Sequence, residues 1–127
     1  MSVIVVDASA VLAFLKNEPG SEKFGEVLGR VAISAVNLAE VAAVLSRTGL
    51  SEDNVGSVLS GLNLAVIVFD REQAIATGVL QGVGRRHGLS LGDRACLALA
   101  KAMQLPVLTT DRSWARLDMG VEVRLAR

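Results

Sequence analysis

The sequence predicts an α/β fold, a sandwich of helices around a parallel β-sheet, on two observations. Short runs rich in Val and Ile alternate with helical patterns along the whole chain, which is the order of βαβ units. The first four runs are almost wholly apolar, as strands covered on both faces of a parallel sheet are. The chain of 127 residues shows no internal repeat, low-complexity tract or linker, so we expect one domain.

The individual elements follow from apolar runs, from helical periodicity and from the residues that end helices. The predicted strands are residues 3–6, 31–34, 64–69, 107–109 and 121–124. The predicted helices are residues 10–16, 21–30, 38–48, 51–61, 71–87 and 91–103, with a last short helix from Arg112. Pro19 follows the end of the first helix, and Gly49 is a predicted C-cap of the third.

Composition limits the function classes. No apolar run approaches the roughly 18 residues that a membrane span needs. The start, MSVIVVDAS, has no basic leader and meets an acid at Asp7, unlike a secretory signal. Cys96 is the only cysteine, so an internal disulfide and a thiolate metal site are excluded, and we interpret Cys96 as a small core residue. These features predict a cytoplasmic protein without a membrane segment.

The charge balance does not by itself favour nucleic-acid binding. Lys and Arg number 13, and Asp and Glu also number 13. A neutral chain lacks the basic excess typical of proteins that bind nucleic acids through general electrostatic attraction.

Four carboxylates are expected at the carboxyl edge of the sheet, where ligands bind in parallel α/β folds. Asp7 ends the first predicted strand and Asp111 ends the fourth. Glu40 and Asp93 stand early in helices, and helices that follow strands often begin at this same edge. In a helix, Asp93 shares a face with the apolar residues three, four and seven positions later, so it points toward the core.

Each acid also fits a helix cap, which is the simpler interpretation when each is taken singly. The segment from Asn37 to Glu40 has the form of a capping box, and the segment that ends in Asp93 has a similar shape. Asp70 serves as a comparison, because it also follows a strand. No matching acid accompanies Asp70 nearby in the sequence, so we assign it only the capping role.

The joint pattern favours a metal site over four separate caps. Glu40 and Asp93 both lie on helix faces shared with apolar residues, and a cap does not require an acid on an inward face. Carboxylates close together raise each other's pKa, and a divalent cation among them relieves the repulsion. Oxygen ligands without a cysteine cluster favour Mg²⁺ or Mn²⁺ over zinc. The lone His87 is interpreted as a helix-end residue.

Four segments together resemble the PIN-domain ribonucleases, and in particular the VapC-like toxins of bacterial type II toxin–antitoxin modules. They are VVDASAVLAFLKNEPG, SAVNLAEV, GLSLGDRACLALA and LPVLTTDRSWA. Each segment alone is a weak signal, but the four in this order, at this chain length, are specific. The resemblance covers essentially the whole chain. It implies a three-layer α/β/α sandwich with a central parallel sheet of four to five strands, and a metal-dependent endoribonuclease.

The resemblance also assigns site residues and partners. Its acidic residues fall on Asp7, Glu40, Asp93 and Asp111. Its small hydroxyl residue falls on Ser9, and its final threonine is Thr109 or Thr110, of which we favour Thr110. Some members carry a further acid beyond the last Asp, where this chain has Arg112-Ser113-Trp114, which argues against a complete second metal site. The family also implies a homodimer and a small antitoxin protein that wraps the helices.

The resulting hypothesis is hydrolysis of an RNA phosphodiester by water activated by Mg²⁺ or Mn²⁺. The four acids would hold the cation, or Glu40 would orient the attacking water, and Ser9 and Thr110 would fix the carboxylates. By resemblance, the products carry 5′-phosphate and 3′-hydroxyl ends. With the four acids matched by metal, 13 basic residues face nine other acids. Candidate RNA contacts are Arg85, Arg86, Arg94 and Arg112, each of which is also explained as a solvated surface charge.

Three other function classes are less consistent with the sequence. A receiver-type phosphoacceptor domain would use Asp70, but it requires an acid next to Asp7 and a late Lys, where this chain has Ala8 and Arg112. The segment GVGRRHG lacks the glycine spacing of a dinucleotide-binding loop. A PIN-type module that only binds a partner protein would be marked by loss of the acids, and all four are present.

Overall fold

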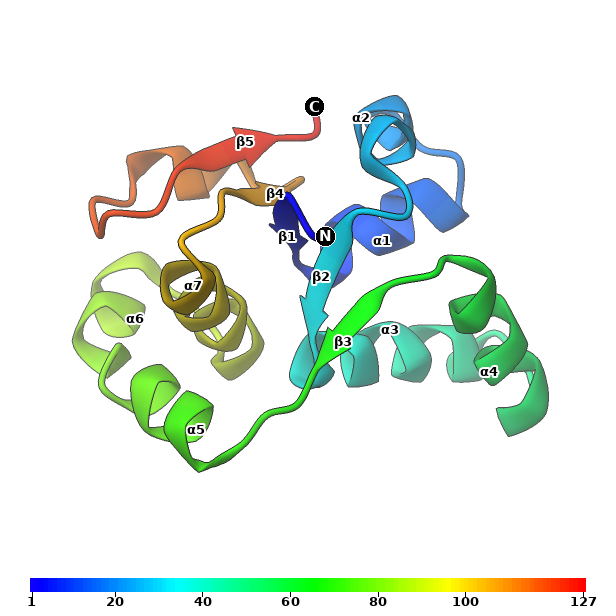
Figure 1. The fold of residues 1–127 in the computed structure, drawn as a ribbon, viewed down its shortest axis with the longest axis horizontal. Coiled ribbons are helices and arrows are strands. Elements are labelled where there is room, and N and C mark those ends of the chain that lie inside the picture. Colours follow the sequence, from blue (N-terminus) through cyan, green and yellow to red (C-terminus); the bar gives the residue numbers. More distant parts are fainter.

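The computed structural model describes residues 1–127 and contains a five-stranded parallel sheet in the order β3-β2-β1-β4-β5. Figure 1 shows this sheet at the centre of the molecule, with helices on either side. The strands are β1 (Ile4–Val6), β2 (Val31–Ser34), β3 (Ala65–Ile67), β4 (Val107–Thr109) and β5 (Val123–Leu125). The predicted parallel sheet is confirmed, with β1 at its centre.

Helices cover both faces of the sheet and complete the three layers (Figure 1). One face carries α1 (Ala8–Leu15), α2 (Ser21–Val27), α3 (Ala35–Arg47) and α4 (Glu52–Gly61). The other carries α7 (Leu91–Met103) and a 3-10 helix, η1 (Arg112–Arg116), with α5 (Arg71–Gly78) packed on α7 and followed by α6 (Gln81–His87). None of the helices combines the length and apolarity needed to span a membrane.

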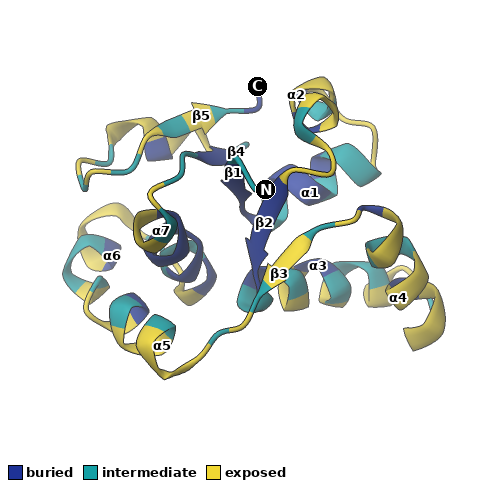
Figure 2. Ribbon diagram, viewed as in Figure 1, coloured by how far each residue is buried: buried dark blue, intermediate teal, exposed yellow.

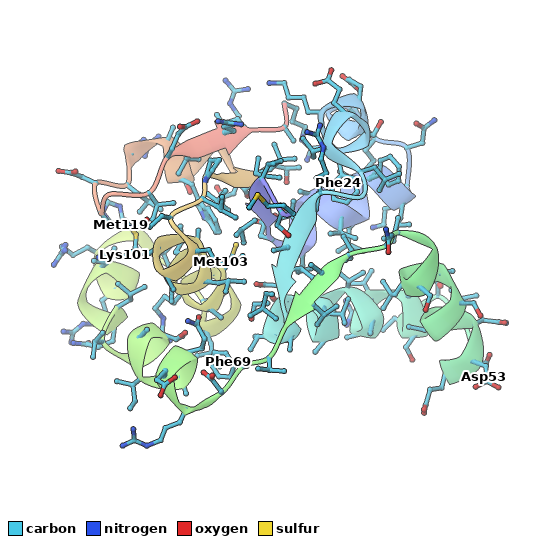
Figure 3. The ribbon with its side chains drawn as sticks, in the orientation of Figure 1. Phe24, Asp53, Phe69, Lys101, Met103 and Met119 are labelled. Atoms are coloured by element: carbon cyan, nitrogen blue, oxygen red, sulfur yellow. The ribbon has the colours of Figure 1, made fainter.

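Strand alternation divides the core into two parts, one on each face of the sheet. In β1, Ile4 and Val6 pack with the α1–α3 side, while Val5 packs with α7. The first part includes Phe24, which is labelled in Figure 3 and is fully buried with its ring 4.8 Å from that of Phe14. In Figure 2, the central strands are buried, whereas the edge strand β3 is largely exposed.

Several predicted helix boundaries differ from the structure, and two of the differences are explained by particular residues. The predicted helix 71–87 is two helices, since α5 ends at Gly78 and α6 starts at Gln81. Gly78 at the end of α5 and Gly82 and Gly84 inside α6 weaken a continuous helix. The third helix begins at Ala35 because Ser34 is its N-cap and accepts a 3.2 Å hydrogen bond from the Val36 nitrogen. Asn37 is therefore not a cap but a buried residue inside α3.

Candidate active site

The carboxyl edge of the central strands carries a hydrogen-bonded cluster around Asp7. Asp7 follows β1 with the same parity as Val5, which packs with α7, so its side chain belongs to that face of the sheet. The residue is only 5% exposed. It is also the N-cap of α1, where Oδ1 accepts a 3.0 Å hydrogen bond from the Ala10 nitrogen. The predicted cap and the predicted site position therefore coincide.

Two hydroxyl groups hold the Asp7 carboxylate. Ser9 Oγ donates to Asp7 Oδ1 at 2.7 Å, as expected for this position, and Thr109 Oγ1 donates to Oδ2 at 2.6 Å. The expectation that Thr110 supports the carboxylate is wrong, because only the Thr110 backbone nitrogen takes part, donating to Ser9 Oγ at 3.1 Å. The reason is parity. Val107 packs toward α7 and Leu108 toward the other face, so Thr109 shares the face of Asp7.

The environment of Asp7 disfavours its ionised form. Burial raises the pKa of the Asp7 carboxyl above its ordinary value, and the nearby Asp93 charge raises it further. The hydrogen bonds from Thr109, Ser9 and Ala10 act in the opposite direction without cancelling the effect of burial. A positive charge beside this carboxylate would relieve the cost of its burial.

Asp93 combines a cap with a site position. Its backbone nitrogen donates to Ser90 Oγ at 3.1 Å, and its Oδ2 accepts from the Ser90 nitrogen at 3.0 Å, a complete capping box. The side chain is nevertheless half-buried. Its charge raises the pKa of both Asp7 and Cys96. The inward direction predicted from the helical face is therefore present, and the cap does not exclude it.

Glu40 reaches the same place from the adjacent helix. The expectation that it lies on the inward face of α3 is wrong, because that face is formed by Asn37 and Val41, and Glu40 is exposed. Its carboxylate is nonetheless fixed, since Asn37 Nδ2 donates to Glu40 Oε1 at 2.8 Å. A Cβ added at Gly92 would lie 2.3 Å from that oxygen. Glu40 therefore lies against the first turn of α7, beside Asp93.

Asp111 follows β4 and caps η1. Its Oδ1 accepts hydrogen bonds from the Ser113 nitrogen at 3.0 Å and from Ser113 Oγ at 2.6 Å. Its own backbone nitrogen donates to Thr109 Oγ1 at 3.0 Å. One threonine hydroxyl therefore links the segments of Asp7 and Asp111, although the Asp111 side chain is exposed.

The four acids share one edge of the sheet, but their side chains are not drawn together. No three carboxylates lie close enough to hold a metal ion in these rotamers. In Glu40, Asp93 and Asp111, one carboxylate oxygen accepts hydrogen bonds from the protein and the other accepts none. Hard oxygen donors with a free oxygen each, around a buried Asp7 of raised pKa, are a donor set that suits Mg²⁺ or Mn²⁺.

Cys96 lies in the core, where the charges of the same acids affect the pKa of its thiol. Its thiol is fully buried, and burial raises its pKa well above the ordinary value. The charges of Asp7, Asp93 and Glu40 raise it further, in that order. Three of the four acids therefore act on one atom at the start of α7. The thiol itself stays protonated and is a core residue, not a nucleophile.

The candidate RNA-binding arginines differ in their surroundings. Arg85 and Arg86 are exposed in the last turn of α6, and Arg112 is exposed directly after Asp111. Arg94 is half-buried, because α5 and α6 cover its side of α7, and its Nη1 donates to the Thr77 carbonyl oxygen at 3.3 Å. The nearby Trp114 is fully buried in the core, so it is not a base-stacking residue.

Asp70 has only the capping role that the sequence predicts. It is exposed after β3, and its Oδ1 accepts a 2.9 Å hydrogen bond from the Gln73 nitrogen. The edge strand β3 is separated from β1 by β2. A receiver-type fold has the strand order 2-1-3-4-5, which differs from the order here. The structure therefore contradicts the phosphoacceptor alternative.

Sequence reasoning missed Asn37 as part of this cluster. It is 1% exposed, and its Nδ2 also donates to the Gly92 carbonyl oxygen at 3.0 Å. The available signal was a polar residue on the apolar face of α3, one turn before Glu40. The capping-box interpretation already accounted for Asn37 and Glu40, so the burial of Asn37 was not predicted.

Comparison with known proteins gives concordant similarities. Residues 4–119 match the PIN domain family. Ribonuclease VapC42 of Mycobacterium tuberculosis is 29% identical over an aligned length of 126 positions, and the match covers 91% of this chain and 96% of the relative. DNA-bound VapBC from Salmonella typhimurium matches with a TM-score of 0.73 at 22% identity, over 100% of both chains. A toxin–antitoxin complex from Klebsiella pneumoniae matches with a TM-score of 0.75 at 16% identity, over 98% of both chains.

Proposed function

The chain belongs to the PIN domain family, and we propose that it is a divalent-metal-dependent endoribonuclease, the toxin of a toxin–antitoxin module. One observation carries this assignment. Asp7, buried and held by two hydroxyl groups, shares the carboxyl edge of the sheet with Glu40, Asp93 and Asp111. The ribonuclease activity of its relative VapC42 supports the same reaction class.

Asp7, Glu40, Asp93 and Asp111 are the residues that would hold Mg²⁺ or Mn²⁺. When bound, such a cation lowers the pKa of a water molecule and neutralises charge on the phosphate. Ser9 and Thr109 keep both oxygens of Asp7 oriented, through the hydrogen bonds of 2.7 and 2.6 Å. Support for a positive partner comes from the raised pKa of Asp7, which burial and the Asp93 charge cause.

Glu40 is the group best suited to orient the attacking water. Its Oε1 accepts a hydrogen bond from Asn37, its Oε2 accepts none from the protein, and the residue as a whole is exposed. Helix α3 carries Glu40, and helix α7 carries Gly92, against which the Glu40 carboxylate lies. A carboxylate oxygen held in this way can accept a hydrogen bond from water in a defined direction.

No side chain at this edge is needed as a covalent nucleophile. The Cys96 thiol is fully buried with a raised pKa, which keeps it protonated. The only histidine, His87, is exposed at the end of α6, and no serine–histidine hydrogen bond is present. Direct attack of water on the phosphodiester is consistent with these groups.

We propose that Arg112, Arg85 and Arg86 contact the RNA backbone. Arg112 is exposed one residue beyond Asp111, and the arginines of α6 precede the loop that leads to Ser90 and Asp93. Arg94 is a weaker candidate than the sequence indicated, because the Thr77 carbonyl oxygen already engages its guanidinium.

We also propose an antitoxin partner and a homodimer. The matching structure from Klebsiella pneumoniae is a toxin–antitoxin complex, and the one from Salmonella typhimurium is DNA-bound VapBC. This chain exposes apolar side chains that suit protein partners, among them Val66 at 44% and Val68 at 69%. Sedimentation equilibrium of the purified chain tests the dimer, which should have about twice the 13.3 kDa of the monomer.

The central test is RNA cleavage by the purified protein with Mn²⁺ or Mg²⁺, beside EDTA. Asp7→Asn should lower the rate at least about a hundredfold, roughly 3 kcal/mol of transition-state stabilisation. Asp70→Asn is the matched control, because Asp70 also follows a strand and caps a helix, and it should keep full activity. Cleaved ends should carry 5′-phosphate and 3′-hydroxyl groups.

Two outcomes would contradict the assignment. Cleavage that persists in EDTA, or full activity of Asp7→Asn, excludes the metal-dependent mechanism. If no RNA is cleaved with either metal, a non-catalytic PIN-type module that binds a partner protein is favoured instead. For the toxin role, expression in bacteria should arrest growth with the natural sequence and not with Asp7→Asn.

A further inference from the structure

We propose that Asn37 is a positioning residue that holds the Glu40 carboxylate against the first turn of α7, and that glycine at position 92 leaves the space this carboxylate occupies. The inference rests on the proposed function in one respect, that Glu40 takes part in RNA cleavage. The tether itself is a property of the structure. Neither residue touches the reacting atoms, and both act through Glu40.

The hydrogen bonds of Asn37 define the orientation of its amide. Nδ2 donates to Glu40 Oε1 at 2.8 Å and to the Gly92 carbonyl oxygen at 3.0 Å. Both partners are acceptors only, so the nitrogen of the amide must face them. The first bond lies within α3, and the second joins α3 to α7 across 55 positions of the chain. The amide therefore binds the carboxylate and the helix that carries Asp93 at the same time.

The burial of Asn37 indicates that its donor group is needed. The residue is 1% exposed, and its Oδ1 is buried without any hydrogen-bond partner. An unpaired buried oxygen is costly, and replacement by an apolar residue of similar size removes that cost. Val41, one turn further along the same face, is fully buried and shows what the position accepts for packing alone. The amide is explained by what Nδ2 binds.

Glycine is required at position 92 because of the nearby Glu40 carboxylate, and not because of the backbone conformation at Gly92. Its φ is not positive, and it lies in the first turn of α7, where glycine weakens a helix. A Cβ at this position would lie 2.3 Å from Glu40 Oε1, 2.7 Å from Cδ and 2.8 Å from Oε2. Only glycine leaves room for the carboxylate where Asn37 holds it.

The tether matters because nothing else fixes Glu40. Its side chain is exposed, and Asn37 is its only hydrogen-bond donor in the protein. Without that bond, the carboxylate would sample several rotamers at the surface. Because only Oε1 is bound, Oε2 remains free for water or for a cation.

The first measurement is the steady-state cleavage of RNA at saturating Mn²⁺. Asn37→Leu keeps the size of the side chain and removes its donor, and it should lower kcat about 10- to 100-fold with little change in KM for RNA. Ser34→Ala is the control, because it removes the N-cap of the same helix without touching Glu40. If Asn37→Leu fails to fold, Asn37→Ala provides the same test, because alanine also lacks a donor.

The second measurement asks whether both residues act through Glu40. In a Glu40→Ala background, Asn37→Leu should cause no further loss of kcat. Gly92→Ala should lower kcat and weaken Mn²⁺ binding measured by calorimetry, whereas Gly56→Ala, in open space on α4, should change neither. Equal losses of kcat in Gly92→Ala and Gly56→Ala would overturn the inference. Additive losses of kcat when Asn37→Leu is combined with Glu40→Ala would also overturn it.

The third measurement needs no activity. The side-chain amide signals of Asn37 in a ¹⁵N–¹H spectrum should shift in Glu40→Ala and stay in place in Asp70→Asn. If they do not shift, the tether is refuted whether or not RNA is cleaved. If they shift while the natural protein cleaves no RNA, the tether stands and the proposed function fails.

Discussion

Thr109 Oγ1 donates a 2.6 Å hydrogen bond to Asp7 Oδ2 and accepts a 3.0 Å hydrogen bond from the Asp111 nitrogen. The two segments it joins follow β1 and β4, which are adjacent in the sheet. One hydroxyl therefore links the Asp7 carboxylate to the backbone of Asp111, the first and last acids of the candidate site. It also satisfies an oxygen of a carboxylate that is 5% exposed.

Thr109→Val should destabilise the protein by about 1–3 kcal/mol, because it leaves Asp7 Oδ2 buried without a donor. Cleavage of RNA should fall as well, since the carboxylate loses one of its two hydroxyl supports. Thr110→Val is the matched control, because only the backbone of Thr110 takes part in the cluster. Urea unfolding of both variants measures the difference, and equal free energies of unfolding would refute the role of Thr109.

Asp7→Asn should stabilise the metal-free protein near neutral pH while abolishing cleavage. Since the pKa of Asp7 is raised from 3.8 in the folded state, the folded protein binds a proton that the unfolded chain releases. Stability is therefore lost as pH rises from about 4 through the raised pKa of Asp7. The Asn variant lacks this loss, so its advantage in Tm should grow over that interval. Added Mg²⁺ should stabilise the natural protein and not the variant.

Arg112→Gln should weaken RNA binding and reduce the slope of log affinity against log salt by about 0.7, the value of one phosphate contact to a single strand. The measurement is fluorescence anisotropy with labelled RNA, made in an Asp111→Asn background to prevent cleavage. Arg30→Gln is the control. Arg30 is exposed and directly precedes β2, so it lies at the opposite edge of the sheet. A change of the same size in both variants would indicate non-specific attraction only.

Arg94→Ala should loosen the packing of α5 and α6 on α7, at a cost of roughly 1–2 kcal/mol. The guanidinium binds the Thr77 carbonyl oxygen, and the side chain fills the space left by Gly84, where a Cβ would lie 2.8 Å from Arg94 Cδ. Hydrogen exchange should increase in residues 71–87 more than elsewhere. Arg86→Ala, at an exposed position, should leave exchange unchanged, and any similar increase there would contradict this role.

Much of the fold followed from local pattern. The helix Leu91–Met103 and the strands Val31–Ser34 and Val107–Thr109 have the predicted bounds, because apolar runs and capping residues mark them directly. The bounds of α3 did not follow, since Ser34 and Asn37 are both good N-caps. Which of them begins the helix depends on where β2 ends in the sheet.

For the site, the sequence could indicate the residue types and the edge but not every partner. A carboxylate that directly follows a buried strand of a parallel sheet, such as Asp7, must lie at the carboxyl edge. The inward direction of Asp93 followed from helical periodicity, and the same reasoning failed for Glu40. Helix α3 buries Asn37 and Val41 instead, because the position of α7 beside it decides which side is covered.

By itself, the sequence determined the parallel sheet between two helical layers and indicated which edge of the sheet carries the candidate acids, because both follow from side-chain periods that are local. The tertiary structure decided that Thr109 holds Asp7, that Asn37 holds Glu40 and that Arg94 turns toward Thr77. The first contact depends on the pairing of β1 with β4, and the second, with Gly92 and Glu40 side by side, on the approach of α3 to α7. The third depends on the packing of α5 on α7. The first and third contacts join residues far apart in the chain, and the Gly92 carbonyl oxygen that orients the Asn37 amide lies 55 positions away. No local period specifies such approaches.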